Sequence, residues 1–241
     1  MTFDALVAAV AARARTATRR APLVAVSGID GSGKSTMAPA LAAVLAGRGV
    51  HAAVVTLDPW HTPAPMRFNA RDPARHFYRH AFRWAELFER VIDPLRRDRG
   101  LELVLPLLRL ADDSWYDHVY DFHDVDVVIL EGIFVLRRLL RPRYDVAVWI
   151  HCSVETALRR ALVRNQEGRD VAGLETDYAT IYFPAQRLHL RRDQPQTTAD
   201  MILDNDVDGA APWSLAGTTA APVFESLDAA RQAVTDAVTQ P

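Results

Sequence analysis

The sequence predicts an α/β fold: a doubly wound parallel sheet with helices on both faces. Short apolar runs typical of buried strands alternate with longer segments of helical pattern. A glycine-rich stretch directly follows the first run and leads into a helix-like segment, as in the opening βαβ unit of a parallel sheet. The apolar runs of strand type cover residues 23–26, 52–57, 125–130 and 145–150.

The first half of the chain is divided by helix breakers. Residues 2–19 predict an amphipathic helix that Pro22 ends. A second helix is expected over residues 34–46 and stops at Gly47. Residues 58–73 contain four prolines and are expected to be irregular.

The second half carries further strands and helices around one ambiguous segment. Residues 106–123 are rich in aromatics and aspartates, and they predict either a hairpin or an excursion over a site. A helix over 174–192 is expected to bend at Pro184. The remaining expected elements are helices over 74–97 and 154–165, strands over 101–105 and 199–203, a loose tail over 209–222 and a last helix over 225–238.

The composition bounds the function classes. The 241 residues suffice for one sizeable core, and a net charge of −2 gives no overall footprint for nucleic acid. A single cysteine, Cys152, cannot form an internal disulfide, and we expect it to be a small buried residue. No secretory pattern opens the chain, and no apolar run reaches the ~18 residues that span a bilayer. We therefore expect a cytoplasmic protein with no membrane partner.

The glycine-rich stretch at residues 28–35, GIDGSGKS, fits the phosphate-binding pattern G-x-x-x-x-G-K-[ST], the Walker A motif. Glycines let the backbone curl so that its N–H groups point at phosphate oxygens, and the following helix adds its positive end. Lys34 would contact the β- and γ-phosphates, and the Ser35 hydroxyl would bind Mg²⁺. We assign ATP binding to Gly28, Asp30, Gly31, Ser32, Gly33, Lys34, Ser35 and Thr36.

Two carboxylates follow predicted strands, where ligands of a parallel sheet bind. Asp58 ends the second strand and could accept a proton from a substrate hydroxyl, or it could merely start the turn at Pro59. Glu131 ends the strand over 125–130 and could hold Mg²⁺ directly or through water, or it could be an ordinary turn residue. Asp126, at the other end of that strand, should face away from the site.

Arginines gather in the helix over 154–165 and the polar loop after it. A lid arginine that closes over ATP would stabilise the charge of a migrating phosphoryl group and exclude water. We assign this role to Arg164 and Arg169, and Lys34 and Asp58 complete the expected catalytic set. A solvated basic helix face accounts for Arg159 and Arg160.

Over residues 22–206 the chain resembles the uridine kinase/phosphoribulokinase group of P-loop kinases, and within it the uridine–cytidine kinases. The segments that carry the resemblance are 26–36, VSGIDGSGKST; 58–61, DPWH; 71–73, RDP; 128–132, VILEG; 159–170, the lid; and 199–205, ADMILDN. The resemblance implies a P-loop NTPase fold of nucleoside monophosphate kinase type with a small lid. It also implies that Asp58 is catalytic, that Asp72 holds ribose hydroxyls, and that the last segment lies near the adenine.

The resemblance is weaker where those kinases read the base. They carry a Pro-x-Tyr-Asp segment, whereas Pro106 is followed here by Leu107, Leu108 and Arg109. Trp115, Tyr116 and His118 are either substitutes for it or packing residues. Residues 61–78 resemble a bacterial branch labelled uridine kinase-like, in which His61 either contacts substrate or caps its loop.

The organisation expected from these observations is a kinase domain over 1–208 and a tail over 209–241. Within the domain, the acceptor-binding segment covers 58–120 and the lid covers 164–173. The leading hypothesis is transfer of phosphate from ATP, with Mg²⁺, to the 5′-hydroxyl of a nucleoside such as uridine or cytidine. Rival hypotheses are a kinase for pantothenate, a sugar phosphate or a natural-product intermediate, a nucleotide-dependent switch or regulatory ATPase, and a degraded kinase that only binds. The expected partner is this small acceptor, and homo-oligomer formation is left open.

Overall fold

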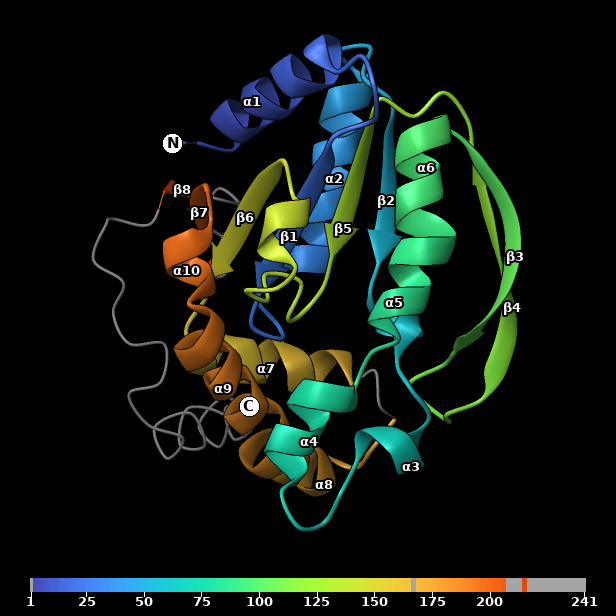
Figure 1. Cartoon of the computed structure of the whole chain (residues 1–241). Helices are drawn as coiled ribbons and strands as arrows, with labels where there is room; N and C mark the ends of the chain where they lie inside the picture. Colours follow the sequence, from blue (N-terminus) through green and yellow to red (C-terminus); the bar gives the residue numbers. More distant parts are fainter. Residues whose placement is uncertain (1, 166–167, 207–213, 216–241) are drawn as a thin grey trace.

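The computed structural model describes residues 2–165, 168–206 and 214–215, and its core is a parallel sheet (Figure 1). The strand order is β2-β5-β1-β6-β7-β8. The first five of these run parallel, and only the two-residue β8 is antiparallel to its neighbour β7. Its strands are β1 (Leu23–Gly28), β2 (Ala52–Thr56), β5 (Val127–Glu131), β6 (Val146–His151), β7 (Met201–Asp204) and β8 (Ser214–Leu215).

Helices cover both faces of this sheet, which confirms the predicted fold class. Helices α1 (Phe3–Thr16) and α2 (Lys34–Ala46) bury Leu6, Val10 and Leu41 against one face. The other face is covered by the segment from α4 to α6 and by α7 and α9. The helices other than α1 and α2 are α3 (Ala64–Arg67), α4 (Pro73–His80), α5 (Trp84–Leu87), α6 (Asp93–Asp98), α7 (Val154–Arg164), α8 (Val171–Asp177), α9 (Phe183–Asp193) and α10 (Pro195–Thr198), among the described residues.

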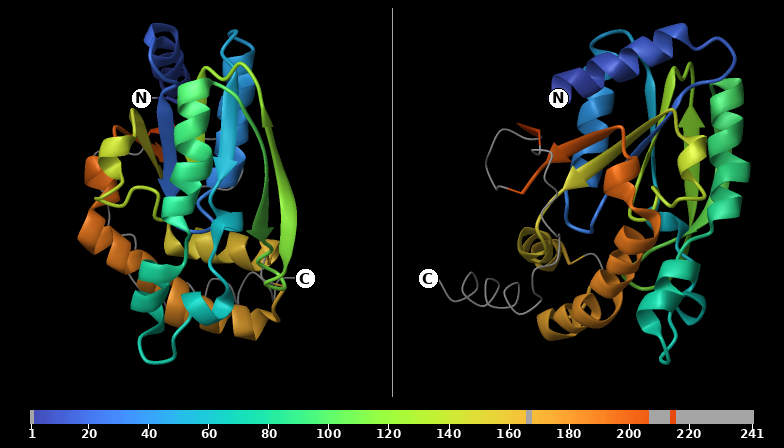
Figure 2. Two further views of the ribbon diagram at one scale, coloured as in Figure 1. Left: turned by 45° about the vertical axis from the view of Figure 1, so that its right-hand side comes forward. Right: turned by 60° about the vertical axis from the view of Figure 1, so that its left-hand side comes forward.

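The ambiguous segment is a hairpin. Strands β3 (Leu101–Leu108) and β4 (Trp115–Phe122) pair antiparallel and form a separate two-stranded sheet beside the main one (Figure 2). The predicted strand over 101–105 is therefore too short, because Pro106 is tolerated in this isolated edge pair. The tip of the hairpin, residues 109–114, reaches the carboxyl end of the main sheet (Figure 1).

Three local expectations need correction. The first helix ends at Thr16, three residues before the predicted end at residue 19. The irregular segment 58–73 contains the 3-10 turn η1 (Asp58–Trp60) and the short helix α3. The helix expected over 174–192 begins earlier, at Val171, and runs without a break through α8, the π-helical turn η4 (Tyr178–Tyr182) and α9. Pro184, which has no N–H to donate to the preceding turn, lies just after that π-helical turn. The tail expected over 209–222 and the helix over 225–238 fall outside the described residues, apart from the two residues of β8.

Within the described part of the chain, no helix has the length and apolar character that a membrane crossing requires. The remaining short elements are the π-helical turn η2 (Phe88–Ile92), which continues α5 into α6, and the 3-10 turn η3 (Arg141–Arg143) before β6.

A buried ion pair fastens α6 to the amino end of the sheet, and its removal should destabilise the fold. The Asp145 carboxylate accepts from Arg96 Nη2 at 2.6 Å and from the Leu23 amide at 2.8 Å. Since the Arg96 side chain is only 4% exposed, Asp145→Ala leaves a buried cation without its partner and should lower the free energy of unfolding by about 3 kcal/mol. Chemical denaturation measures this loss. Asp98→Ala, which removes the exposed partner of Arg97, should change stability little, and an equal loss in both variants would contradict the assignment.

Candidate active site

The phosphate-binding loop joins β1 to α2 with the backbone that its glycines allow. Gly31 and Gly33 have φ angles of +76° and +96°, in the left-handed region that side chains disfavour. A Cβ on Gly31 would lie 2.3 Å from the Ala157 carbonyl oxygen, so α7 packs directly on the loop backbone. Lys34, the only lysine in the sequence, is buried and donates from Nζ to the Ile29 carbonyl at 2.8 Å. Its ammonium therefore contacts the backbone of the phosphate-binding loop, where it is expected to bind the phosphates.

Glu131 lies beside the loop at the carboxyl end of β5. The Ser35 hydroxyl donates to it, with distances of 3.2 Å to each carboxylate oxygen, and the Thr56 hydroxyl at the end of β2 also donates to it. A hydroxyl and a carboxylate are hard oxygen ligands of the kind that Mg²⁺ prefers. Ser35 and Glu131, the predicted metal residues, are thus brought together, and their donor set fits that ion.

Asp58 begins η1, immediately after β2, and lines the same pocket as Lys34 and Ser35. Burial raises the pKa of its carboxyl, and the negative charges of Glu131 and Asp30 raise it further. Lys34 and Arg164 act in the opposite direction, because their positive charges favour the ionised form. A carboxyl in such surroundings is suited to exchange a proton with a neighbouring hydroxyl.

Asp30 ties the loop to the helices at the carboxyl end of the sheet. Its carboxylate accepts from Arg164 Nη2 at 2.9 Å and from the Tyr178 hydroxyl, and its backbone N–H donates to Gln186 Oε1 at 2.7 Å. Burial alone would raise the pKa of Asp30, but the charges of Arg164 and Lys34 outweigh it and lower the pKa to about 2. Tyr178 and Gln186 were not predicted, since no local pattern links residues 148 and 156 positions apart.

The predicted lid arginines both line the pocket, and each has a carboxylate partner. Arg164 pairs with Asp30, and Arg169 Nη1 lies 3.2 Å from Asp177 Oδ2. Arg160 instead donates to the Asn205 carbonyl at 2.9 Å, and Asn205 Nδ2 donates to the Ser32 carbonyl at 2.8 Å. Arg160 thus braces the phosphate-binding loop against the chain that follows β7, a role that a solvated basic face does not describe.

A pocket of about 530 Å³ extends from the phosphate-binding loop to the tip of the hairpin. Beyond Asp58 its walls include the stacked rings of Phe68 and Phe77, whose centroids are 5.8 Å apart. The Arg67 Nη1 donates to Asp113 Oδ1 at 2.5 Å, and Asp113 Oδ2 accepts from the Ala64 amide at 2.8 Å. This pair, which sequence reasoning missed, closes the hairpin tip over the outer half of the pocket.

The remaining predicted acceptor residues are divided between this pocket and other places. His61 lines the pocket, and its Nδ1 lies 2.5 Å from the Asp58 carbonyl. Burial lowers the pKa of His61 to about 3, so the ring is neutral and, because a carbonyl only accepts, Nδ1 carries the proton and Nε2 is an acceptor. Asp72 is not brought to this pocket: it caps α4 by accepting from the Arg75 amide. Trp115, Tyr116 and His118 lie on β4 outside the pocket.

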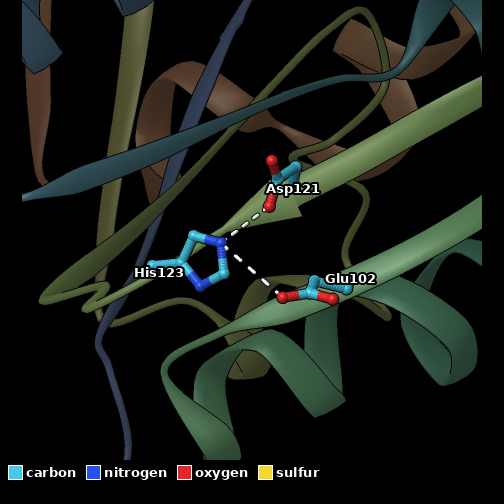
Figure 3. A group of neighbouring side chains, drawn as sticks. All are labelled: Glu102, Asp121 and His123. Carbon is cyan, nitrogen blue, oxygen red and sulfur yellow. Dashed lines mark ion pairs between the residues drawn. The ribbon is translucent and has the colours of Figure 1, made fainter.

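A second group of metal-ligand residues lies on the hairpin, away from this pocket. Asp121 is paired across the strands with Glu102, and His123 lies two residues further along (Figure 3). His123 Nε2 is 2.7 Å from Asp121 and 3.8 Å from Glu102. All three side chains are exposed, so these ion pairs contribute little, and the group requires no ion to satisfy it.

Comparisons with known proteins agree with this architecture. Structural similarity extends to a possible uridine kinase from Bacillus stearothermophilus, at 20% identity and a TM-score of 0.63, over 83% of this chain and 96% of that one. A candidate fructose transport system kinase from Silicibacter sp. TM1040 gives 24% identity and a TM-score of 0.66, over 84% and 98%. D-glycerate 3-kinase from Cryptococcus neoformans var. grubii is similar at 14% sequence identity and a TM-score of 0.61. The similarity covers 86% of this chain and 97% of that one.

Sequence comparison is less extensive. The family model of the methylmalonyl Co-A mutase-associated GTPase MeaB matches residues 4–64, which contain α1, the phosphate-binding loop and β2. No curated protein matches the chain. The fold and the loop together define a protein of the P-loop NTPase class. Its fold is similar to that of these three structures, whose names refer to different acceptors.

The close packing of α7 on the loop can be tested with two glycines. Gly31→Ala and Gly49→Ala both place a side chain at a positive φ, which costs about 1–2 kcal/mol. Only Gly31→Ala also forces a Cβ into the Ala157 carbonyl, whereas nothing lies within 4 Å of a Cβ on Gly49. Gly31→Ala should therefore destabilise the chain more in urea denaturation and weaken nucleotide binding at least tenfold. Equal effects of the two changes would argue against this packing.

Proposed function

We propose that the chain is an ATP-dependent kinase that phosphorylates a hydroxyl group of a small metabolite, and that a nucleoside such as uridine or cytidine is its leading acceptor. One observation carries the proposal: a single pocket contains the phosphate-binding residues Lys34 and Ser35, the carboxylate Asp58 and a separate outer region. A protein that only hydrolyses its nucleotide needs no second region for an acceptor.

The residues of this pocket have distinct roles in the proposed reaction. Asp58 accepts the proton from the acceptor hydroxyl or orients it, and its raised pKa favours that exchange. Lys34 contacts the β- and γ-phosphates, while Arg164 and Arg169 stabilise the charge on the migrating phosphoryl group. Ser35 and Glu131 would hold Mg²⁺, which, when bound, offsets the negative charge of the triphosphate.

The outer region supports an acceptor with both an apolar ring and hydrogen-bonding groups. Phe68 and Phe77 offer ring faces, and the neutral His61 offers an acceptor nitrogen next to Asp58. A nucleoside has a planar base and ribose hydroxyls that fit such surroundings. Pantothenate, a sugar phosphate or a natural-product alcohol remains the enzymatic alternative. The need for ATP and the buried single thiol agree with a cytoplasmic setting.

A GTPase is the second candidate function, because the MeaB family model matches residues 4–64. That match covers the phosphate-binding loop, which kinases and GTPases share. It does not extend to Glu131 or to the lid arginines. A GTPase would prefer GTP and would show no stimulation by any small alcohol.

Acceptor-stimulated ADP release tests the proposal. Purified protein with Mg·ATP should release ADP faster when the matching acceptor is present, in a panel of nucleosides, pantothenate and sugar phosphates. Asp58→Asn should lower this stimulated rate by about 10²–10⁴-fold, as expected for loss of a general base, and should retain ATP binding. Asp126→Asn, at the opposite end of β5, serves as the control and should stay near the wild-type rate. Undiminished turnover in Asp58→Asn would refute its role as the base, and GTP turnover without stimulation would favour the GTPase.

The single lysine allows a test of nucleotide binding that needs no acceptor. An amine-reactive reagent can modify only Lys34 and the α-amino group, so peptide mass spectrometry reads the site without ambiguity. Mg·ATP should protect Lys34 from the reagent, because its ammonium would contact the bound phosphates. Labelling of the α-amino group should stay unchanged and serves as the internal control. Labelling of Lys34 that is the same with ATP, GTP or neither would contradict nucleotide binding at this loop.

A further inference from the structure

A second pocket, remote from the phosphate-binding loop, is lined mostly by arginines. It has a volume of about 350 Å³ and lies between α4, the loop after β5 and the end of α9. We call it the arginine pocket. Its charged and polar walls are formed by Tyr78, Arg79, Arg137, Arg138, Arg192 and Asp193.

Among the described residues, the positive charges in the wall of this pocket outnumber the negative ones. Asp193 is the one acidic residue in the described part of its wall, and its carboxylate already accepts from three other groups. The Tyr78 hydroxyl donates to Oδ2 at 2.5 Å, His189 Nδ1 lies 2.7 Å from Oδ2, and the Arg138 amide donates to Oδ1 at 3.1 Å. Among the described residues, no carboxylate forms an ion pair with any of the four arginines that line the pocket.

Arg137 forms the inner wall and is held there by aromatic rings. Its guanidinium carbon lies 4.3 Å from the ring centroid of Tyr78 and 5.5 Å from that of Trp84. Two of its nitrogens, Nε and Nη2, are buried and have no hydrogen-bond acceptor. A buried guanidinium without an anionic partner is costly, since burial disfavours its charge. The rings therefore hold in place a guanidinium of which two nitrogens lack a hydrogen-bond acceptor.

We propose that the arginine pocket binds a small anion with a phosphomonoester-type group, either inorganic phosphate or the phosphate of a small ester. Guanidinium groups donate pairs of parallel hydrogen bonds to oxyanions, which suits phosphate. The wall contains four arginines and one carboxylate, so the excess positive charge suits a ligand with two negative charges better than a ligand with one. The Tyr78 ring and the exposed Leu139 at the rim offer an apolar contact for the organic part of an ester. The volume fits a small ligand and excludes a polymer chain from the interior.

The arginine pocket shares its supporting elements with the candidate active site. Helix α4 contributes Phe77 to the active-site pocket and Tyr78 to the arginine pocket. Helix α9 likewise contributes Gln186 to one pocket and Arg192 to the other. The loop after β5 supplies Ile133 to the first and Arg137 to the second. An anion in the arginine pocket thus contacts the same three elements that shape the active-site wall.

Titration with phosphate tests the site, provided that the phosphate-binding loop is weakened first. The reference protein is the Lys34→Ala variant, titrated calorimetrically with inorganic phosphate at constant ionic strength. Adding Arg79→Gln and Arg192→Gln should weaken binding at least tenfold, because each change removes a positive charge and its charge-assisted hydrogen bonds to the anion. Both side chains are exposed, so the fold should be retained. Arg15→Gln with Arg19→Gln removes two exposed charges at the α1 end of the chain and should leave the affinity within twofold.

Affinities that fall equally in the two double variants would overturn the proposal, because the effect would then be one of net charge. Hydrogen exchange of the Lys34→Ala variant gives an independent location. Phosphate should protect residues 73–80, 134–140 and 186–193, whereas protection confined to residues 28–36 would overturn the site. A nucleoside monophosphate that binds more tightly than inorganic phosphate would identify an ester as the ligand, and equal affinities would identify phosphate itself.

Discussion

The parallel register of β2, β5 and β1 is the constraint on which the candidate active site depends. It sets Glu131 opposite Thr56 on one side and Val26 on the other. Through this register Glu131 meets Ser35 and Thr56, which are 96 and 75 residues away in sequence. A slip of one residue would turn Glu131 to the opposite face and leave Ser35 without it. Sheet pairing thus fixes the positions of the residues that we propose would hold a metal ion.

Local patterns predicted the parts of the site that lie at strand ends. The phosphate-binding loop was predicted from its motif, and Asp58 and Glu131 were predicted from their positions at the ends of strands. The structure brings these residues into one region. Gln186 and Tyr178 could not be predicted, because each reaches Asp30 through tertiary packing of a distant helical segment. Asp72 was assigned by resemblance alone, and here its carboxylate caps α4 outside the pocket. Residues 101–105 were predicted as a strand, but residues 106–123 were left open between a hairpin and an excursion, because the sequence does not show which strand an isolated strand pairs with.

The same distinction applies to the arginines. Their number in the sequence says little, since a solvated helix face and a binding site look alike in composition. Their partners distinguish them: Arg160 braces the loop through Asn205, while Arg79 and Arg137 line a pocket in which, among the described residues, no carboxylate forms an ion pair with them. Charge compensation is a property of three-dimensional neighbours, so it appears only once the helices are packed.

Pairing of positive with negative side chains also explains how the active-site pocket remains stable without a ligand. Arg164, Arg169 and Arg67 each have a carboxylate partner, namely Asp30, Asp177 and Asp113, and Lys34 rests on a carbonyl of its own loop. Each of these ion pairs engages one guanidinium nitrogen, Nη2 of Arg164 and Nη1 of Arg169 and of Arg67, whereas a guanidinium carries five N–H donors. An entering phosphate would therefore share a guanidinium with its carboxylate or take the place of that carboxylate, and either costs less than exposing a bare cation. Among the described residues neither Asp58 nor Glu131 forms an ion pair, although the charges of Lys34 and Arg164 act on Asp58, and such neighbouring carboxylates would favour a bound divalent cation.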